Sequence, residues 1–155
     1  MSSVHRKLNQ SLVGNRTRIN AYENGEFVGF DVTYRGEGDD ERDSQGFRIY
    51  KYPGLLLHFS ERSFNIEKVT PISPGKSRMQ RWFWFDRSVN SGERNSTIEF
   101  SNEVMDEDMG ICAEVQRNLE GGIYHTGFLS QEREPGTIFF QQCVRNSLEE
   151  DRVSD

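Results

Sequence analysis

Residues 27–86 hold a series of short segments in which apolar and polar side chains alternate, and turn residues separate the segments. In the first segment, residues 27–35, one face carries Val28, Phe30, Val32 and Tyr34, which is typical of a strand. The other segments are residues 47–52, 55–60, 64–72 and 79–86. Because consecutive strands joined by short turns pair as antiparallel neighbours, this region predicts an antiparallel sheet of roughly four strands or more.

Two helix patterns follow the strands. Ser96, with Glu99 three residues later, resembles a capping box and predicts the start of a helix that spans about 97–120. Gly121 and Gly122 then provide a stop. The segment "TIFFQQCVRNSLEE" predicts a final helix, with Ile138, Cys143, Val144 and Leu148 among its apolar positions. Strands followed by helices predict an α+β fold with the helices on one face of the antiparallel sheet.

The pattern also divides the chain. Residues 1–20 are polar and basic and are expected to form a lead-in. Residues 21–150 are expected to form a single domain, because a chain of 155 residues suits one modest core. Residues 151–155 are expected to form a frayed tail.

An acidic cluster, Asp106, Glu107 and Asp108, lies inside the first predicted helix. At about 100° per residue, Asp108 falls within an apolar stripe, whereas Asp106 points away from it and Glu107 lies at its edge. The members of that stripe are Met105, Cys112, Val115 and Leu119. Because Asp is rarely buried unless it is paired or binds a metal, Asp108 is a candidate functional residue.

Composition excludes several classes of partner. The formal net charge of -6 argues against nucleic acid, because phosphate binding needs a basic face. No apolar run approaches the roughly 18 residues that span a membrane, and the N-terminus has no apolar signal segment. Cys112 and Cys143 both fall within apolar patterns, which favours buried thiols over a disulfide. Together these features predict a cytoplasmic protein.

Other chemistry has weaker support. A calcium loop starting at Asp106 would need Gly at 111 and Glu at 117, and these positions hold Ile111 and Arg117. The three histidines, at positions 5, 58 and 125, form no HxxxH or HxxxxH pair and are more typical of structural residues than of metal ligands. Neither cysteine has a base nearby in the sequence, so a thiol nucleophile is disfavoured.

The aromatic run "WFWF" in residues 82–85 is open to two interpretations. Alternation places Phe83 and Phe85 on one face of a strand and Trp82 and Trp84 on the other. These rings would either pack in the core, which is the more common case, or offer their faces to a cationic ligand. All four are therefore candidate pocket residues.

Three segments in order resemble one family. "YPGLLLHFSERSFNIEKVTPISPGKSRMQRWFWFD" resembles the strands of the catalytic domain in Rieske-type non-haem iron oxygenase α subunits. "EDMGICAEVQRNLEGGIYHTGFLS" resembles the helix that follows them, and "EPGTIFFQQCVRNSL" resembles the closing helix. The resemblance covers roughly residues 47–148 and is nearest to the branch of choline, glycine betaine and carnitine monooxygenases.

The resemblance implies a helix-grip (START-like) fold and a mononuclear Fe(II) site. The Asp of the acid-Asp pair is the carboxylate ligand of that iron, and its match here is Asp108. In the family, a reductase delivers electrons to a two-iron, two-sulfur cluster, the iron activates O2, and a C–H bond is hydroxylated. This sequence lacks the Cys-x-His pairs of the cluster and the segment with the two iron-binding histidines, so the fold is expected to be incomplete relative to the family.

Two hypotheses follow. In the first, the chain is the C-terminal segment of such a catalytic domain, contributes a carboxylate ligand and part of the substrate pocket, and is inactive alone. It would act as an oxygenase only with a polypeptide that carries the cluster and the two histidines, such as a complementary or full-length α subunit. In the second, it is a non-catalytic helix-grip module that binds an apolar or cationic ligand or serves assembly.

Overall fold

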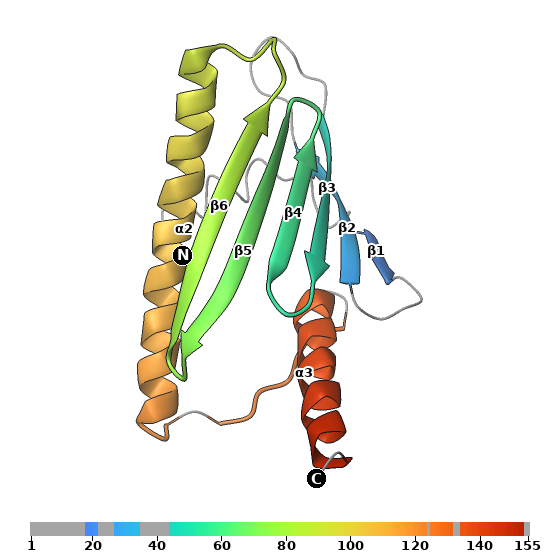
Figure 1. The fold of residues 1–155 in the computed structure, drawn as a ribbon, viewed down its shortest axis with the longest axis vertical. Coiled ribbons are helices and arrows are strands. Elements are labelled where there is room, and N and C mark those ends of the chain that lie inside the picture. Colours follow the sequence, from blue (N-terminus) through green and yellow to red (C-terminus); the bar gives the residue numbers. More distant parts are fainter. Residues whose placement is uncertain (1–17, 22–26, 35–43, 124, 132–133, 154–155) are drawn as a thin grey trace.

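The structure, a computed structural model, describes residues 18–21, 27–34, 44–123, 125–131 and 134–153. Within them, six strands form one antiparallel sheet in which each strand pairs with its neighbour in the sequence (Figure 1). The strands are β1 (Arg18–Ala21), β2 (Phe27–Tyr34), β3 (Ser44–Lys51), β4 (Leu55–Ser60), β5 (Ser63–Ser73) and β6 (Lys76–Phe85). The predicted antiparallel sheet is therefore confirmed.

Two helices follow the sheet, α2 (Ser91–Glu120) and α3 (Pro135–Val153). Helix α2 runs alongside β6, and α3 lies near the ends of β3 and β4 (Figure 1). Strands followed by helices give the predicted α+β class. Neither helix is long and apolar enough to cross a membrane, and this holds for all helical residues that the structure describes.

The register of the sheet shows which face the helices cover. Four residues are aligned across β3 to β6: Tyr50, Leu56, Glu67 and Arg81. Directly opposed residues point to the same side of a sheet. Arg81 donates a hydrogen bond to the carbonyl of Ser101 in α2, and the Tyr50 ring lies 6.4 Å from the ring of Phe139 in α3. Both helices therefore lie on this face, called here the helix-facing face, and the other is called the open face.

The boundaries of the strands agree in part with the predicted ones. β4 has the predicted bounds, and β2, β3, β5 and β6 differ from the prediction by one to three residues at their ends. β1 was not predicted, because its short polar sequence "RINA" falls across the end of the expected lead-in. Pairing with β2, rather than any apolar alternation of its own, identifies it as a strand.

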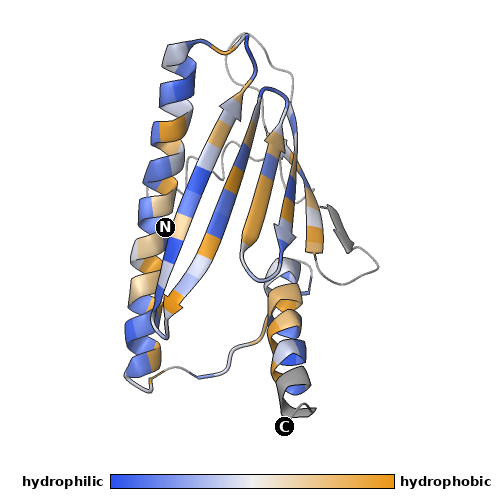
Figure 2. Ribbon diagram, viewed as in Figure 1, coloured by the Kyte–Doolittle hydropathy of each residue, from blue (hydrophilic) through white to orange (hydrophobic). Residues whose placement is uncertain are grey.

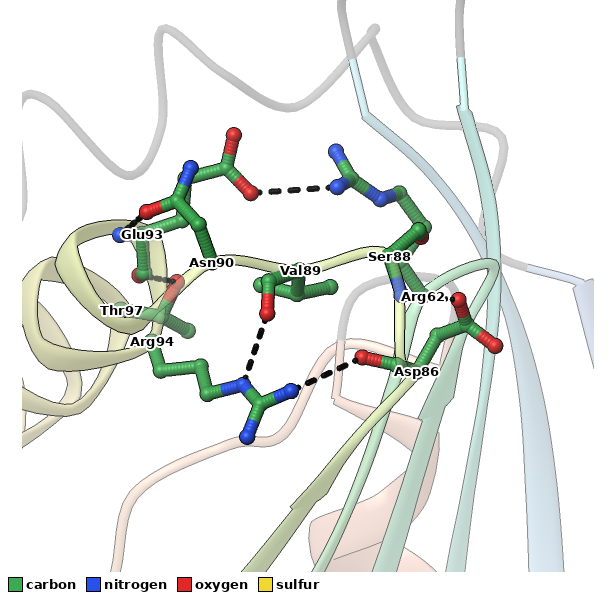
Figure 3. A network of polar contacts seen from close by, with 8 residues as sticks. All are labelled: Arg62, Asp86, Ser88, Val89, Asn90, Glu93, Arg94 and Thr97. Atoms are coloured by element: carbon green, nitrogen blue, oxygen red, sulfur yellow. Dashed lines mark hydrogen bonds and ion pairs between the residues drawn. The ribbon is translucent and has the colours of Figure 1, made fainter.

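The predicted start of the long helix is wrong. Helix α2 begins at Ser91 after the N-cap Asn90, whose side chain accepts a hydrogen bond of 3.0 Å from the backbone N–H of Glu93 (Figure 3). Ser96 lies inside the helix. Asn90 and Glu93 have the same spacing as Ser96 and Glu99, and Gly92 lies in the first turn of the helix.

Further contacts fix the start of α2 to the end of the sheet. Arg94 donates to the carbonyls of Val89, at 2.9 Å, and Asp86, at 3.3 Å (Figure 3). Arg62, from the β4–β5 turn, forms an ion pair of 3.1 Å with Glu93. The N-terminus of α2 is thus held by the loop that leads into it, and the rest of the helix runs along the sheet.

Helix α3 starts with Pro135, a residue suited to the first position of a helix. It continues to Val153 and thus includes residues 151–153 of the expected tail. Apolar side chains of the core are few: Val28, Val32 and Val89 are buried. Figure 2 shows orange bands on the strands and mixed colours along α2.

The apolar stripe predicted for the long helix is only partly covered. Met105 and Asp108 are half-buried, but Cys112, Val115 and Leu119 are exposed. The stripe has the predicted phase in its first half, where α2 lies over the cavity described below. In its second half the side chains are exposed, with Val115 at 43% and Leu119 at 49%, so the stripe is not buried over its whole length.

Candidate functional site

A cavity of about 690 Å³ lies between the helix-facing face of the sheet and the first half of α2. Its wall includes polar side chains from four strands and apolar side chains from the helix. The polar ones used below are Arg48, His58, Asn65, Glu67 and Arg81. A cavity of this volume is within the range of small-molecule sites.

Glu67 and Arg81 form a largely buried ion pair in the cavity wall. They are opposed in the register of β5 and β6, and Arg81 Nε donates to Glu67 Oε1 at 3.0 Å. Glu67 is buried, and the Arg81 side chain is only 12% exposed. The same guanidinium donates to the carbonyl and hydroxyl of Ser101 and to Asn102 Oδ1. Arg81 therefore ties the sheet to α2.

His58 faces the second oxygen of Glu67. Its Nε2 lies 3.6 Å from Glu67 Oε2, which is too long for a direct hydrogen bond but close enough for an ion pair when the imidazole is protonated. Burial raises the pKa of the Glu67 carboxyl, but His58 and Arg81 lower it by more, so the pKa lies below its usual range. Glu67 is thus an anion near neutral pH.

The acidic cluster divides as its helical phase predicts. Asp108 is half-buried and lines the cavity, whereas Asp106 is exposed. Ser101, Met105 and Asp108 line the same cavity at spacings of four and three residues, which places them on one face of α2. Asp108 therefore lines the same cavity as His58, Glu67 and Arg81.

The four aromatic residues of β6 lie on two faces. Phe83 and Phe85 share the helix-facing face with Arg81, and Phe85 lines the cavity. The Arg81 guanidinium carbon lies 5.0 Å from the centre of the Phe83 ring, so the protein's own cation occupies that ring face. Trp82 and Trp84 lie on the open face, at 41% and 49% exposure, away from the cavity.

The remaining candidate residues do not join the site. His125 is exposed in the loop before α3, and His5 lies outside the described residues. Cys112 is exposed and Cys143 is half-buried, so the expectation of two buried thiols is wrong for Cys112. Both are free cysteines, as expected.

Sequence reasoning missed the Glu67–Arg81 pair. Arg81 lies between Met79 and Phe83, where an alternating strand would carry a core residue, and this is a signal that could have identified it. Glu67 shares its side of the strand with Asn65, whereas Phe64 and Ile66 form the apolar side, so the sequence gives no such signal for Glu67. Only the register shows that they are opposed.

Comparison with known proteins agrees with this fold. The family model of the ring hydroxylating alpha subunit (catalytic domain) matches residues 4–150. The chain is similar to the chloroplastic choline monooxygenase of Arabidopsis thaliana, with 27% identity over 93 residues, or 59% of this chain and 22% of that protein.

A solved structure is also similar, that of the quaternary ammonium Rieske monooxygenase CntA in complex with an inhibitor. The TM-score is 0.61 at 11% sequence identity, over 76% of this chain and 33% of that one, so this likeness concerns the fold. The chain spans only 22% and 33% of the lengths of these two relatives. Because the family model matches nearly the whole sequence, the chain belongs to the ring hydroxylating alpha subunit (catalytic domain) family.

Proposed function

We propose that this chain is the C-terminal segment of a Rieske-type oxygenase catalytic domain and that Asp108 is a carboxylate ligand of its mononuclear iron. One observation carries the assignment: Asp108 lines the cavity between α2 and the sheet, while Asp106, two residues earlier, is exposed. The family resemblance and the helical phase select the same residue independently. The iron, when bound, would supply the activation of O2.

The donors present do not complete such a site. A ferrous centre of this type takes two imidazoles together with a carboxylate. Among the residues that the structure describes, no three His, Cys, Asp or Glu side chains come together as metal ligands. His58 is in the cavity wall but faces Glu67. The proposal therefore requires both imidazoles, and the Rieske cluster, from polypeptide outside this sequence.

We further propose that the completed enzyme belongs to the branch of quaternary ammonium monooxygenases and works with a reductase. The similarity to choline monooxygenase supports this branch. Phe85 would contribute an aromatic wall to the substrate pocket, whereas Trp82 and Trp84 would not, because they lie on the open face. A cytoplasmic location remains a prediction of the sequence.

Iron analysis after dialysis tests the proposal. The purified chain alone is expected to retain less than about 0.1 iron per chain, because one carboxylate is a weak ferrous site. Co-expression with an α-subunit segment that carries the two histidines is expected to give close to stoichiometric iron in the co-purified complex. Asp108→Ala is expected to abolish that gain, and the matched control Asp106→Ala is expected to leave it unchanged.

Two outcomes contradict the proposal in different ways. Stoichiometric iron in the isolated chain would show that it needs no outside ligands. A complex in which Asp108→Ala binds iron as well as the unmodified chain would show that another residue is the carboxylate ligand. Circular dichroism of both variants verifies that they are folded.

A second candidate function uses the same cavity without a metal. Its volume of about 690 Å³ suits a small organic ligand, and Glu67 is a buried anion in its wall. Under this alternative, the chain is a ligand-binding or assembly module. Choline binding by the isolated, iron-free chain, measured by calorimetry and lost in Phe85→Ala, would favour it over the enzyme segment.

A further inference from the structure

The open face of the sheet presents two adjacent apolar rows. The register aligns Phe47, Phe59, Phe64 and Trp84 in one row and Ile49, Leu57, Ile66 and Trp82 in the next. The rings of the first row stack, with centroid distances of 4.6 Å from Phe59 to Phe64 and 5.3 Å from Phe64 to Trp84. Phe59, Trp82 and Trp84 are 40%, 41% and 49% exposed, and both described helices lie on the other face.

Charges of opposite sign flank the two rows. At the end of the first row, a shallow hollow brings Asp31 and Glu61 together with Phe47 and Phe59, and Glu61 Oε1 accepts a hydrogen bond from the Gln45 N–H at 3.2 Å. Beyond the second row, the register places Lys51 and Lys68 on either side of Leu55. Along the strands, the surface thus runs from Glu61 through the two apolar rows to Lys51 and Lys68, while Asp31, aligned with Phe47, lies at the side of the first row.

This order makes the face complementary to itself. A two-fold axis that lies in the interface and runs along the strands would set acids against acids. An axis that lies in the interface and runs across the strands reverses the direction of the second copy. The first apolar row of one copy then faces the second row of the other copy. Glu61 of one copy faces the region between Lys51 and Lys68 of the other.

We propose that a second copy of this chain packs face to face on the open face, about a two-fold axis that runs across the strands. The geometry is that of two sheets packed through their apolar faces. The proposal concerns the open face and does not depend on the function proposed for the cavity, although Phe59 and Glu61, at the end of β4, line that cavity as well.

The size of the contact sets the expected affinity. The contact is four strands wide, at about 4.8 Å per strand, and four rows long, at about 6.8 Å per row of alternate residues. Its area is therefore roughly 500 Å² per copy. The total of about 1,000 Å² is near the lower limit for a specific interface, so a dissociation constant on the order of 10 μM is expected. Its charged rim should make the dimer weaker at high salt.

Sedimentation velocity of the full chain over a range of concentrations tests the proposal. The unmodified protein is expected to shift from one chain of 18.0 kDa toward twice that mass as its concentration rises. Glu61→Lys and Lys68→Glu should each raise the dissociation constant at least tenfold, because each sets like charges against each other. The double variant Glu61→Lys/Lys68→Glu restores opposite charges and should recover most of the association.

Two further variants complete the design. Trp84→Glu places a charge in the apolar centre and should leave a monomer, with circular dichroism as the check on folding. Glu99→Lys makes the same charge change as Glu61→Lys on an exposed residue of α2, away from the open face, and should leave the dimer intact. If Trp84→Glu fails to fold, the charge exchange still decides the question.

Several results would overturn the proposal. One is a chain that stays monomeric at about 100 μM, well above the expected constant. Another is a dimer that Glu61→Lys and Lys68→Glu leave unchanged, which would mean that another surface associates. A third is a double variant no better than the single ones, which would contradict the antiparallel pairing of the two copies.

Discussion

At the scale of single residues, a buried ion pair holds two layers of the molecule together. Glu67 is the one buried charged residue in the part of the chain that the structure describes, and Arg81 both neutralises it and bonds to α2. A buried pair of this kind is costly to break, because the remaining charge has no water to solvate it. The role of Arg81 is thus larger than that of a surface cation.

Arg81→Met should lower the free energy of unfolding by about 3 kcal/mol, because it leaves the Glu67 carboxylate buried without its partner. The matched control is Arg62→Met, which removes the exposed Arg62–Glu93 pair, with side chains 55% and 48% exposed. That change should cost less than about 1 kcal/mol. Urea denaturation measures both, and equal losses would contradict a special role for Arg81.

At the scale of elements, the N-cap of α2 shows that a local sequence pattern alone does not determine where a helix begins. Two residues, Asn90 and Ser96, each precede a Glu by three positions, so either could open the helix. Ser96 was predicted to open the helix, and Asn90 was not identified. In the structure, Asn90 caps the helix while Arg94 anchors it to the preceding loop.

Asn90→Ala should destabilise the chain by about 1 kcal/mol, because the Glu93 N–H loses its hydrogen-bond acceptor. Ser96→Ala should change the stability by less than about 0.5 kcal/mol, since Ser96 lies on the surface inside the helix. Thermal denaturation of the two variants compares them directly. A larger loss for Ser96→Ala would show that the helix begins later in solution.

The second helix is linked to the sheet through Tyr50. Its ring contacts Phe139 and Phe140 edge-on at 6.4 Å and 6.2 Å, and its hydroxyl donates to the Pro53 carbonyl at 3.0 Å. Burial, followed by the nearby Cys143 and Tyr52, raises the pKa of Tyr50 to about 12. The neutral phenol is therefore the form that the folded chain favours.

The stability should fall as the pH rises from 10 to about 12. In this interval the unfolded chain loses the Tyr50 proton while the folded chain keeps it, so the free energy of unfolding declines; below pH 10 both forms are protonated and the effect is absent. Tyr50→Phe should flatten this decline relative to the unmodified chain in urea titrations at pH 9 to about 12. An identical slope in Tyr50→Phe would mean that other groups cause it.

At the scale of the whole molecule, the sequence predicted the class of fold better than the site. Short alternating or apolar segments between turn residues identified β2 to β6, and helical phase placed Asp108 on the inner side of α2. The Glu67–Arg81 pair could not be predicted, because it depends on which residues are opposed across two strands. The helical phase of α2 likewise could not predict which part of the apolar stripe is buried, since Val115 and Leu119 are apolar yet exposed.

The order of strands has a consequence for how the chain acquires its structure. Each strand of the sheet pairs with the strand next to it in the sequence, from β1 to β6. Contacts between near neighbours close only short loops, so the entropy lost at each step is small, and such topologies fold fast. Each hairpin can form as soon as its second strand leaves the ribosome, and the sheet can be in place before α2 and α3 are synthesised.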